Sequence, residues 1–425
     1  MPRILIVRGH LVTPWELGPW RELPERFEVS YLLTRANGYA APQGLRAVPA
    51  RSLRDLLPRG PLGEVGAGLL GDRYLSAEQA FADADVVHAE ELSFWFSAEA
   101  AKRKRRHGFK LVQTIWETLP FLDAYRNRHA REHRRRVLAE TDLFLPATER
   151  AAQALRLEGV AQERMLVCPP GIDVERFARV GANGAAAAAH EHVIVSPGRL
   201  VWEKGHQDVL RALAALHRGT VTLPDGSTAR PRLSIVGSGP EEQRLRAHAA
   251  ELGVGHAVEI AAVPYERMPD VFAGASAMVL ASHDTAGAAY HPFDVPRVFW
   301  EEQFGLVIAE AMAAGLAIVT TTSGAIPEVV AGADVALLAP GDWMGIARAL
   351  AAGPLARAAG ARVAHPQELV RGYSNAAAAA RLASAYDHVL AGAGAGPGEA
   401  SGEGLSAGGE GLSAGAAAPQ PAAGE

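Results

Sequence analysis

Cysteine is almost absent from this chain, since Cys168 is the only one in 425 residues. A single thiol excludes a disulfide framework and a metal cluster built on several thiolates. Chains that keep their thiols reduced belong mostly inside the cell. We therefore expect a cytoplasmic protein without disulfides.

Long apolar runs and an excess of positive charge are also missing. No apolar run approaches the roughly 20 residues that a membrane-spanning helix needs. The first short run, residues 4–7, is too brief for the core of a signal peptide and predicts a buried strand. The formal net charge of −5 argues against general nucleic-acid binding.

What the chain does have is apolar content for ordinary cores, with 48% hydrophobic residues. Short β-like runs alternate with helical patterns, which is typical of doubly wound parallel sheets. One series of predicted strands covers residues 4–7, 29–33, 86–88, 111–114 and 143–146. A second series covers residues 193–196, 233–236, 257–260, 277–280 and 317–320.

Low-complexity sequence separates the two series and ends the chain. We predict a first domain at residues 1–180, a linker at 181–192, a second domain at 193–372, a closing helix at 373–390 and a disordered tail at 391–425. Ligands of parallel sheets bind beyond the carboxyl ends of the strands, so two facing sheets predict a site in the cleft between them.

Glu310 stands alone in the most apolar helical stretch, FWEEQFGLVIAEAMAAG. A buried carboxylate without a partner costs several kcal/mol, and the neighbouring sequence offers no partner. Gly305 precedes the helix, whose first amides favour a phosphate. Glu302 lies eight residues before Glu310, so the two carboxylates could bind hydroxyls on either side of a diphosphate, as in a nucleotide sugar. The alternative is that Glu310 accepts local hydrogen bonds and Glu302 is solvated.

Two cations follow another predicted strand. Arg199 and Lys204, in GRLVWEKG, stand at its carboxyl end, where they could neutralise a diphosphate. The alternative is an exposed loop with ordinary surface charges. Gly237 and Gly239 follow the next strand, although a GxG turn is weak evidence by itself.

Together, GRLVWEKG, VGSGPE, EEQFGLVIAEAMAAG and SGAIPEVV resemble the donor-binding half of the retaining family 4 glycosyltransferases. The resemblance covers residues 147–390 well and the N-terminal half more loosely. It implies the GT-B fold, in which two Rossmann-like doubly wound domains face each other across a cleft. It also implies retaining transfer from a nucleotide-diphosphate sugar to an unidentified glycan, lipid or small-molecule acceptor, without a metal or other cofactor.

The resemblance implies a role for several individual residues. It assigns the donor diphosphate to Arg199 and Lys204, the donor sugar to Glu302 and the ribose to Glu310. It assigns phosphate binding to the backbone amides at Gly305 and Leu306. The base is expected near Ala262 and Val263. The remaining donor-site candidates are Gly237 and Phe304.

The N-terminal half departs from the family pattern. Where the family often has a glycine pair in the first loop, this chain has only Gly9 before His10. The resemblance implies that Gly9, His10, Trp116 and His291 belong to the acceptor side or to a closure loop. Where the family often has a histidine near the reacting sugar, this chain has Trp116 and Glu117. Either Glu117 takes over a polar role, in catalysis beside Arg199, Lys204 and Glu302, or this chain has a different acceptor geometry. The alternative to both is that Trp116 is core and Glu117 is a cap or solvated. A nucleotide-sugar-binding homologue without turnover and another GT-B enzyme, such as a sugar-nucleotide epimerase, both remain open.

Two insertions and two basic segments complete the sequence. Residues 283–300 bring His291 near the donor sugar, and residues 218–232, with Pro-Asp-Gly, predict a surface hairpin. The basic residues at 102–106 and 126–136 indicate either solvated helix faces, which we favour, or peripheral contact with an anionic membrane.

Overall fold

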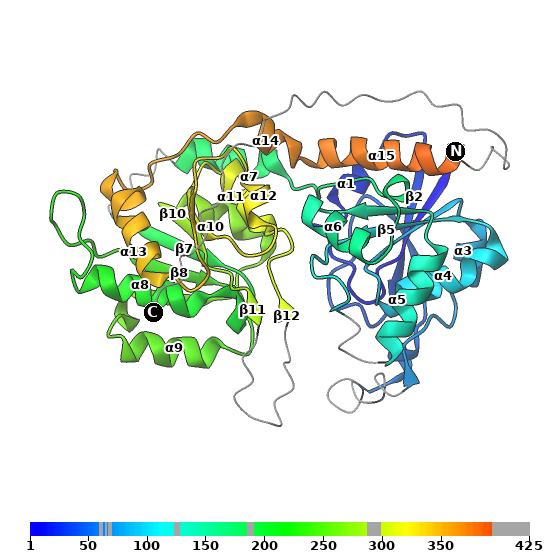
Figure 1. The fold of residues 1–425 in the computed structure, drawn as a ribbon, viewed down its shortest axis with the longest axis horizontal. Helices are drawn as coiled ribbons and strands as arrows, with labels where there is room; N and C mark the ends of the chain where they lie inside the picture. Colours follow the sequence, from blue (N-terminus) through cyan, green and yellow to red (C-terminus); the bar gives the residue numbers. More distant parts are fainter. Residues whose placement is uncertain are drawn as a thin grey trace, which may run out of the picture.

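The computed structural model describes residues 1–58, 63, 66, 70–122, 128–184, 191–286 and 299–392. His291 and nearly all of the predicted tail lie outside these residues. Two α/β lobes stand side by side and are bridged by α14 Gln367–Gly372 and α15 Asn375–Ala391 (Figure 1). Each lobe contains one six-stranded parallel sheet, which confirms the predicted two-domain doubly wound fold.

The first sheet has the strand order β3-β2-β1-β4-β5-β6. Its strands are β1 Arg3–Ile6, β2 Glu28–Thr34, β3 Arg46–Ala50, β4 Val86–Glu90, β5 Lys110–Ile115 and β6 Leu143–Pro146. The associated helices are α1 Gly18–Arg21, η1 Leu53–Leu56, α3 Glu78–Asp83, α4 Trp95–His107, α5 Arg128–Glu140, α6 Glu149–Leu157 and η3 Gln162–Arg164. The sequence did not predict β3, because an edge strand tolerates proline and polar residues and so lacks the pattern of a buried strand.

The second sheet has the order β14-β13-β10-β7-β8-β9. Its strands are β7 Val193–Pro197, β8 Arg232–Val236, β9 Val258–Ala261, β10 Ala277–Leu280, β13 Ala317–Thr321 and β14 Ala336–Leu338. Its helices are α7 Val174–Gly184, η4 Trp202–Lys204, α8 His206–His217, α9 Glu242–Glu251, η5 Gly255–Ala257, η6 Tyr265–Arg267, α10 Met268–Ala273, α11 Leu306–Ala313, α12 Ile326–Val329, α13 Trp343–Ala352 and η7 Pro354–Ala356. The short edge strand β14 was also missed from the sequence.

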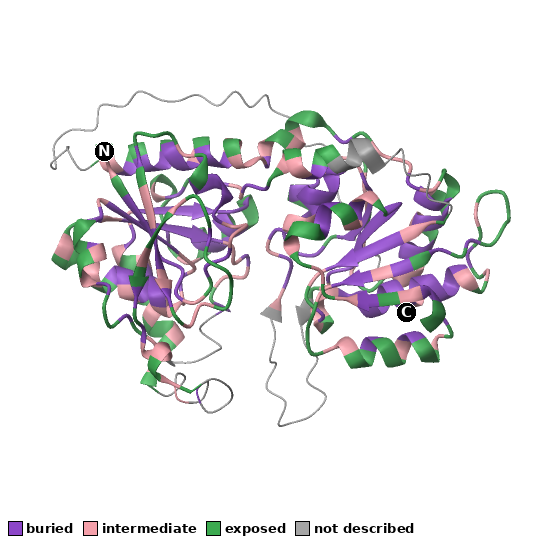
Figure 2. Ribbon diagram, turned by 180° about the vertical axis from the view of Figure 1, so that it is seen from behind, coloured by how far each residue is buried: buried purple, intermediate pink, exposed green. Residues whose placement is uncertain are grey.

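Both sheets are covered on their two faces, so their central strands are buried and the outer helix faces are exposed (Figure 2). This is why the strands of the sheet centres are short apolar runs without alternation. The predicted hairpin at 218–232 is wrong in one respect. The amide of Leu223 donates to the carbonyl of Ser227 at 2.9 Å, but no paired strands form there. The other insertion, at 283–300, instead contains an antiparallel pair near its two ends, formed by β11 Thr285–Ala286 and β12 Phe299–Trp300.

The chain crosses between the domains twice, and the two crossings lie side by side. The amide of Ile172 donates to the carbonyl of Tyr373 at 2.8 Å, and the amide of Asn375 donates to the carbonyl of Ile172 at 3.0 Å. Before the second crossing lies α14 Gln367–Gly372, and after it α15 Asn375–Ala391 packs on the first domain. Helix α7 packs against α10 and α11 of the second domain and runs into the predicted linker as far as Gly184. These paired segments form a narrow hinge.

A buried polar chain fixes α15 to the first domain. The indole of Trp20 donates to the Tyr386 hydroxyl at 2.8 Å, and that hydroxyl lies 2.6 Å from Nδ1 of His88. Nε2 of His88 lies 2.8 Å from the hydroxyl of Thr114. Burial holds the pKa of His88 well below its ordinary value, so the imidazole is neutral. Among the described residues, no helix has both the length and the apolar character that crossing a bilayer requires.

Candidate functional site

A cleft of about 760 Å³ lies between the domains, beyond the carboxyl ends of strands from both sheets. This volume is within the range of small-molecule sites. Its walls include most of the residues proposed from the sequence: Trp116, Glu117, Arg199, Lys204, Glu302, Phe304, Gly305, Leu306 and Glu310. Gly9, His10, Gly237 and Val263 do not line it.

Glu302 is buried, with 6% of its surface exposed, so the alternative of a solvated side chain is wrong. Nζ of Lys204 and the hydroxyl of Ser282 both donate to its Oε2, at 2.6 and 2.7 Å. Nζ of Lys204 also lies 5.0 Å from the centre of the Trp300 ring. The first cationic motif and the first glutamate therefore meet at one point of the cleft wall.

The loop that carries Arg199 and Lys204 is held by its backbone. The amide of Gly198 donates to the carbonyl of Val236 at 2.9 Å. A Cβ on Gly237 would come within 1.9 Å of the Gly198 carbonyl oxygen, so glycine at 237 permits this contact. Glycine at 237 thus has a packing explanation, and its predicted donor role stays a prediction, while Arg199 is exposed to the cleft.

Glu310 is buried, as expected, and its protein partner lies outside the neighbouring sequence. The Tyr265 hydroxyl, 45 residues away in the chain, donates to its Oε1 at 2.8 Å. Burial raises the pKa of Glu310 to about 7, and this hydrogen bond and Arg176 oppose the shift. The tyrosine follows the end of β9, so no local pattern could have revealed the pairing.

Gly305 begins α11 with φ at +77°, a left-handed conformation that favours glycine. The turn leaves the first amides of an eight-residue helix beside the cleft, with Glu310 inside the helix and Glu302 before it. Such amides are unsatisfied donors, and together with the helix dipole they favour an anion. This geometry suits the predicted phosphate contact at Gly305 and Leu306.

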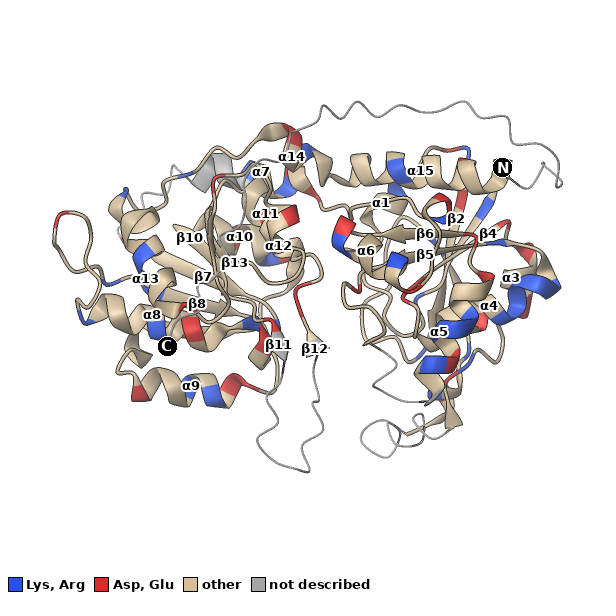
Figure 3. Cartoon of the chain, in the orientation of Figure 1, with Lys and Arg blue, Asp and Glu red and all other residues tan. Residues whose placement is uncertain are grey.

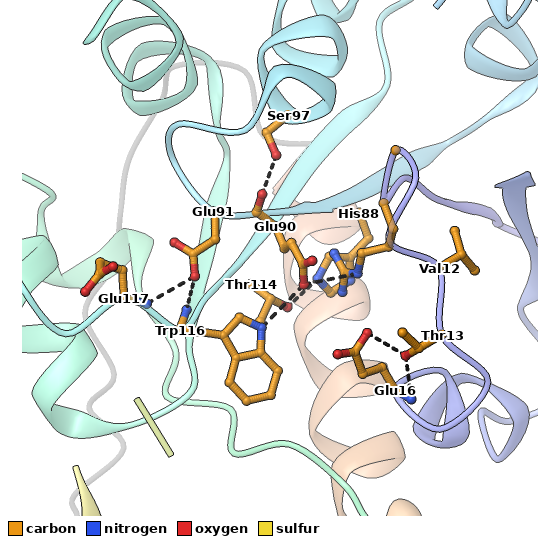
Figure 4. A network of polar contacts seen from close by, with 12 residues as sticks. Val12, Thr13, Glu16, His88, Glu90, Glu91, Ser97, Thr114, Trp116 and Glu117 are labelled. Carbon is orange, nitrogen blue, oxygen red and sulfur yellow. Dashed lines mark hydrogen bonds and ion pairs between the residues drawn. The ribbon is translucent and has the colours of Figure 1, made fainter. Parts of the chain in front are cut away.

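The opposite wall, in the first domain, is rich in carboxylates (Figure 4). Glu91 has a left-handed φ of +61°, and its Oε1 accepts hydrogen bonds from the amides of Trp116 and Glu117 at 2.8 and 3.1 Å. Burial, and then repulsion by Glu117, raises the pKa of Glu91 well above its ordinary value. Glu91 therefore fixes the turn that carries the two residues found in place of the family histidine.

Both carboxylate oxygens of Glu117 accept hydrogen bonds. Its Oε1 accepts from the amides of Thr118 and Leu119 at 3.1 and 3.0 Å, and its Oε2 accepts from Gln303 of the second domain at 3.4 Å. The indole of Trp116 lies edge-on to Phe304, with ring centres 6.4 Å apart. Glu117 is thus a loop cap that also lines the cleft, and its catalytic role stays a prediction.

Sequence reasoning missed a group of charged residues that end β1 and β4. Arg8 and Glu90 form an ion pair at 3.2 Å, and Glu16 accepts from the Thr13 hydroxyl at 2.7 Å. Burial, and then repulsion by Glu90, raises the pKa of Glu16 to about 7. Their position at the carboxyl ends of parallel strands was the available signal, which the resemblance to the donor half did not cover.

The first loop is turned toward its own domain. His10 contacts the hydroxyl of Thr34 at 2.9 Å and the carboxylate of Asp72 at 2.6 Å. A Cβ on Gly9 would come within 2.5 Å of Phe96, which explains glycine there by packing. The acceptor role predicted for these residues stays a prediction. Among the described residues, no group of three or more His, Cys, Asp or Glu side chains is arranged to hold a metal.

Lysine and arginine gather on α4 and α5 of the first domain (Figure 3). In the segment 102–106, four of the five cations form ion pairs, with Glu78, Glu99, Glu140 and Asp142 as partners. This pairing favours the reading of a solvated, structural helix face for that segment.

Two family models match the chain. The model "Glycosyltransferase Family 4" matches residues 20–176, and "Glycosyl transferases group 1" matches residues 184–352. A D-inositol 3-phosphate glycosyltransferase of Acidothermus cellulolyticus is 29% identical over 60% of this chain and 56% of its own length. A GDP-mannose-dependent alpha-(1-6)-phosphatidylinositol monomannoside mannosyltransferase of Mycolicibacterium smegmatis is 34% identical over 38% of this chain and 39% of its own length. The chain thus spans only about half the length of these relatives, or less.

Solved structures share the fold. HepE of Anabaena, in complex with UDP and glucose, has a TM-score of 0.64 at 16% identity over 91% of this chain and all of its own. Sucrose-phosphate synthase of Thermosynechococcus elongatus has a TM-score of 0.64 at 17% identity over 92% of this chain and all of its own. At such identities the likeness concerns the arrangement of the two domains and not the substrates.

Proposed function

The chain belongs to glycosyltransferase family 4, and on that premise we propose that it transfers a sugar from a nucleotide-sugar donor to an acceptor hydroxyl with retention at the anomeric carbon. The observation that carries the proposal is the convergence of Lys204, Glu302, Glu310 and the start of α11 on one wall of the cleft. Distant segments of the chain supply the cation, the two carboxylates and the amides that a sugar, a diphosphate and a ribose require.

In the proposed reaction, Arg199 and Lys204 neutralise the diphosphate as it leaves, and the amides at Gly305 and Leu306 hold its oxygens. The bond from the anomeric carbon to the phosphate oxygen breaks, and a bond to the acceptor oxygen forms on the same face. The acceptor proton passes to the leaving phosphate, so no protein nucleophile is required. Glu302, oriented by Lys204 and Ser282, holds hydroxyls of the transferred sugar.

We propose that the cationic side chains perform the neutralisation without a metal. Chelation by EDTA is then expected to leave the initial rate unchanged. A loss of activity that Mg²⁺ or Mn²⁺ restores would refute this part of the proposal.

The acceptor wall supports a further choice. Glu16, Glu90, Glu91 and Glu117 line it, and Arg8, which lies beside them, is paired with Glu90. Carboxyl groups form hydrogen bonds with hydroxyl groups in either protonation state, whereas the cation beside them that could bind a phosphate, Arg8, is already paired with Glu90. We therefore propose an acceptor that presents hydroxyl groups rather than a phosphate to this wall, although the curated relatives carry inositol phosphate or phosphatidylinositol in their names.

A second candidate is nucleotide-sugar binding without turnover. It is favoured by Glu117, which is occupied by the amides of its own loop where the family often places a histidine. Product formation separates the two candidates. A donor that binds but yields neither a glycosylated acceptor nor free sugar would favour the binding protein.

The experiment that tests the donor site is a thermal shift against UDP-, GDP- and ADP-sugars, with wild type beside Glu310→Ala and Lys204→Ala. A ligand of the native state raises the melting temperature by mass action. A shift with one nucleotide that both variants lose supports the proposed site and selects the base. The absence of a shift with every donor, in folded proteins, would count against it.

A further inference from the structure

Two glutamates of the donor-side motifs have no part in the proposed donor site. Glu301 directly precedes Glu302, and Glu328 lies on α12. Both reach the same element of the first domain, helix α6, which lies on the side that faces the second domain (Figure 1). The guanidinium of Arg150 donates to Glu301 through two parallel hydrogen bonds, from Nε to Oε1 and from Nη2 to Oε2, each 2.6 Å long.

The second glutamate holds the backbone of the same helix. The carboxylate of Glu328 accepts from the amides of Glu149 and Arg150 at 2.7 and 3.2 Å. These are the first amides of α6, which have no partner inside the helix, and the helix dipole favours a carboxylate there. One end of α6 is thus held by the second domain through a side chain and two backbone amides.

The two glutamates belong to segments that enclose Glu302. The amide of Ala325 donates to the Glu302 carbonyl at 2.8 Å, and a Cβ on Gly324 would come within 2.1 Å of that carbonyl oxygen. The Glu302 amide in turn donates to the Ser323 hydroxyl at 3.1 Å. The contacts with α6 therefore set where the segment around Glu302, the residue proposed to hold the donor sugar, stands relative to the first domain.

Only the carboxylate of the pair between Arg150 and Glu301 is buried. The side chain of Glu301 is 7% exposed, whereas that of Arg150 is 46% exposed. Removing the arginine would leave a buried carboxylate without its cation, and the two domains would have to separate at this point to rehydrate it. The hydrogen bonds from Glu301 hold the pKa of Arg150 above its ordinary value.

We propose that Arg150 and Glu301 form an interdomain clamp that positions Glu302 against the acceptor wall. The clamp rests on the proposed transfer reaction, and its two members are positioning residues that act through Glu302. The residues proposed to bind the donor all belong to the second domain, and Glu302 keeps its contacts with Lys204 and Ser282 there without the clamp. Losing the clamp is therefore expected to lower kcat much more than donor affinity. Transfer requires both walls in register, and a misplacement of about 1 Å is enough to slow it by a factor on the order of 100.

The test compares kcat and donor Kd for wild type, Arg150→Gln, Glu301→Gln and the charge-swapped double variant Arg150→Glu/Glu301→Arg. Each single variant is expected to lower kcat at least about tenfold with donor Kd within about twofold of wild type. The swap is expected to restore part of kcat. Arg156→Gln is the matched control, because Arg156 lies on the same helix in an exposed pair with Glu149 and is expected to retain the wild-type rate.

Arg150→Lys keeps the test decisive if Arg150→Gln does not fold. Lysine retains the charge but not the two parallel bonds, so kcat between those of wild type and the glutamine variant supports the clamp. Wild-type kcat in Arg150→Gln, or in Arg150→Lys where glutamine is not tolerated, would overturn it. A fall in donor affinity parallel to the fall in kcat would also overturn it, because the pair would then only support the fold of the donor site.

Small-angle scattering separates the clamp from the proposed function, because it needs no turnover. Arg150→Gln is expected to have a larger radius of gyration than wild type and Arg156→Gln. An unchanged radius would overturn the clamp whatever the activity. An opened variant beside a wild type that binds no nucleotide sugar would support the clamp and refute the proposed function.

Discussion

Glu310 gives the sharpest prediction, a pH dependence of donor binding. Burial raises its pKa from the ordinary 4.5 to about 7. The folded protein therefore binds this proton more tightly than the unfolded chain does. The resulting stabilisation is present below pH 4.5 and is lost as the pH rises toward and through 7, in total about 3 kcal/mol at 1.36 kcal/mol per pKa unit.

Ribose hydroxyls donate hydrogen bonds, and the ionised carboxylate is the better acceptor. If only the ionised form binds the donor, the apparent Kd equals the intrinsic Kd multiplied by 1 + 10^(pKa − pH). With a pKa near 7 the factor is about 11 at pH 6 and about 1.1 at pH 8. The Kd of a nucleotide sugar, whose diphosphate does not titrate in this range, is thus expected to fall about tenfold between pH 6 and pH 8.

Titration calorimetry at pH 6, 7 and 8 measures this slope directly. Glu310→Gln has no titrating group at this position. Its Kd is expected to be larger than that of wild type at pH 8 and to be independent of pH between 6 and 8. Glu16 has a similar pKa on the other wall, and Glu16→Gln is the control that is expected to keep the slope. A flat wild-type profile, or the same slope in Glu310→Gln, would refute the reasoning.

Other substitutions probe the same cleft. Lys204→Gln removes the cation from Glu302 and is expected to weaken donor binding by about 1–3 kcal/mol, measured by calorimetry; an unchanged Kd would contradict the ion pair's role. Gly324→Ala forces a Cβ against the Glu302 carbonyl at φ +53° and is expected to lower stability by about 1–3 kcal/mol in thermal melts, whereas a neutral result would show that the turn relaxes. Glu117→Gln keeps an oxygen for the loop amides, so a fall in kcat of less than about tenfold is expected if the residue is mainly a cap. A phosphorylated acceptor is expected to react more slowly than its unphosphorylated form, and equal kcat/KM values would exclude the proposed preference.

The sequence by itself determined the fold and much of the donor wall. Strand and helix periodicity specified the doubly wound domains, because a buried parallel strand is a short apolar run whatever its neighbours are. The glycine before α11 and the two glutamates around it are local features, so their spacing alone placed Glu302 and Glu310 on either side of one turn. The edge strands β3 and β14 escaped detection for the converse reason, since they are too short or too polar to carry the pattern.

Tertiary structure decided the partners of these residues. Tyr265 reaches Glu310, Lys204 reaches Glu302 and Arg150 reaches Glu301 over separations of 45, 98 and 151 residues. A hydrogen bond depends on the position of two atoms, and no periodicity within either segment encodes the position of the other. The acceptor wall is the clearest case. Its carboxyl groups come from segments that follow different strands and form one polar surface only when those strands lie side by side in the sheet.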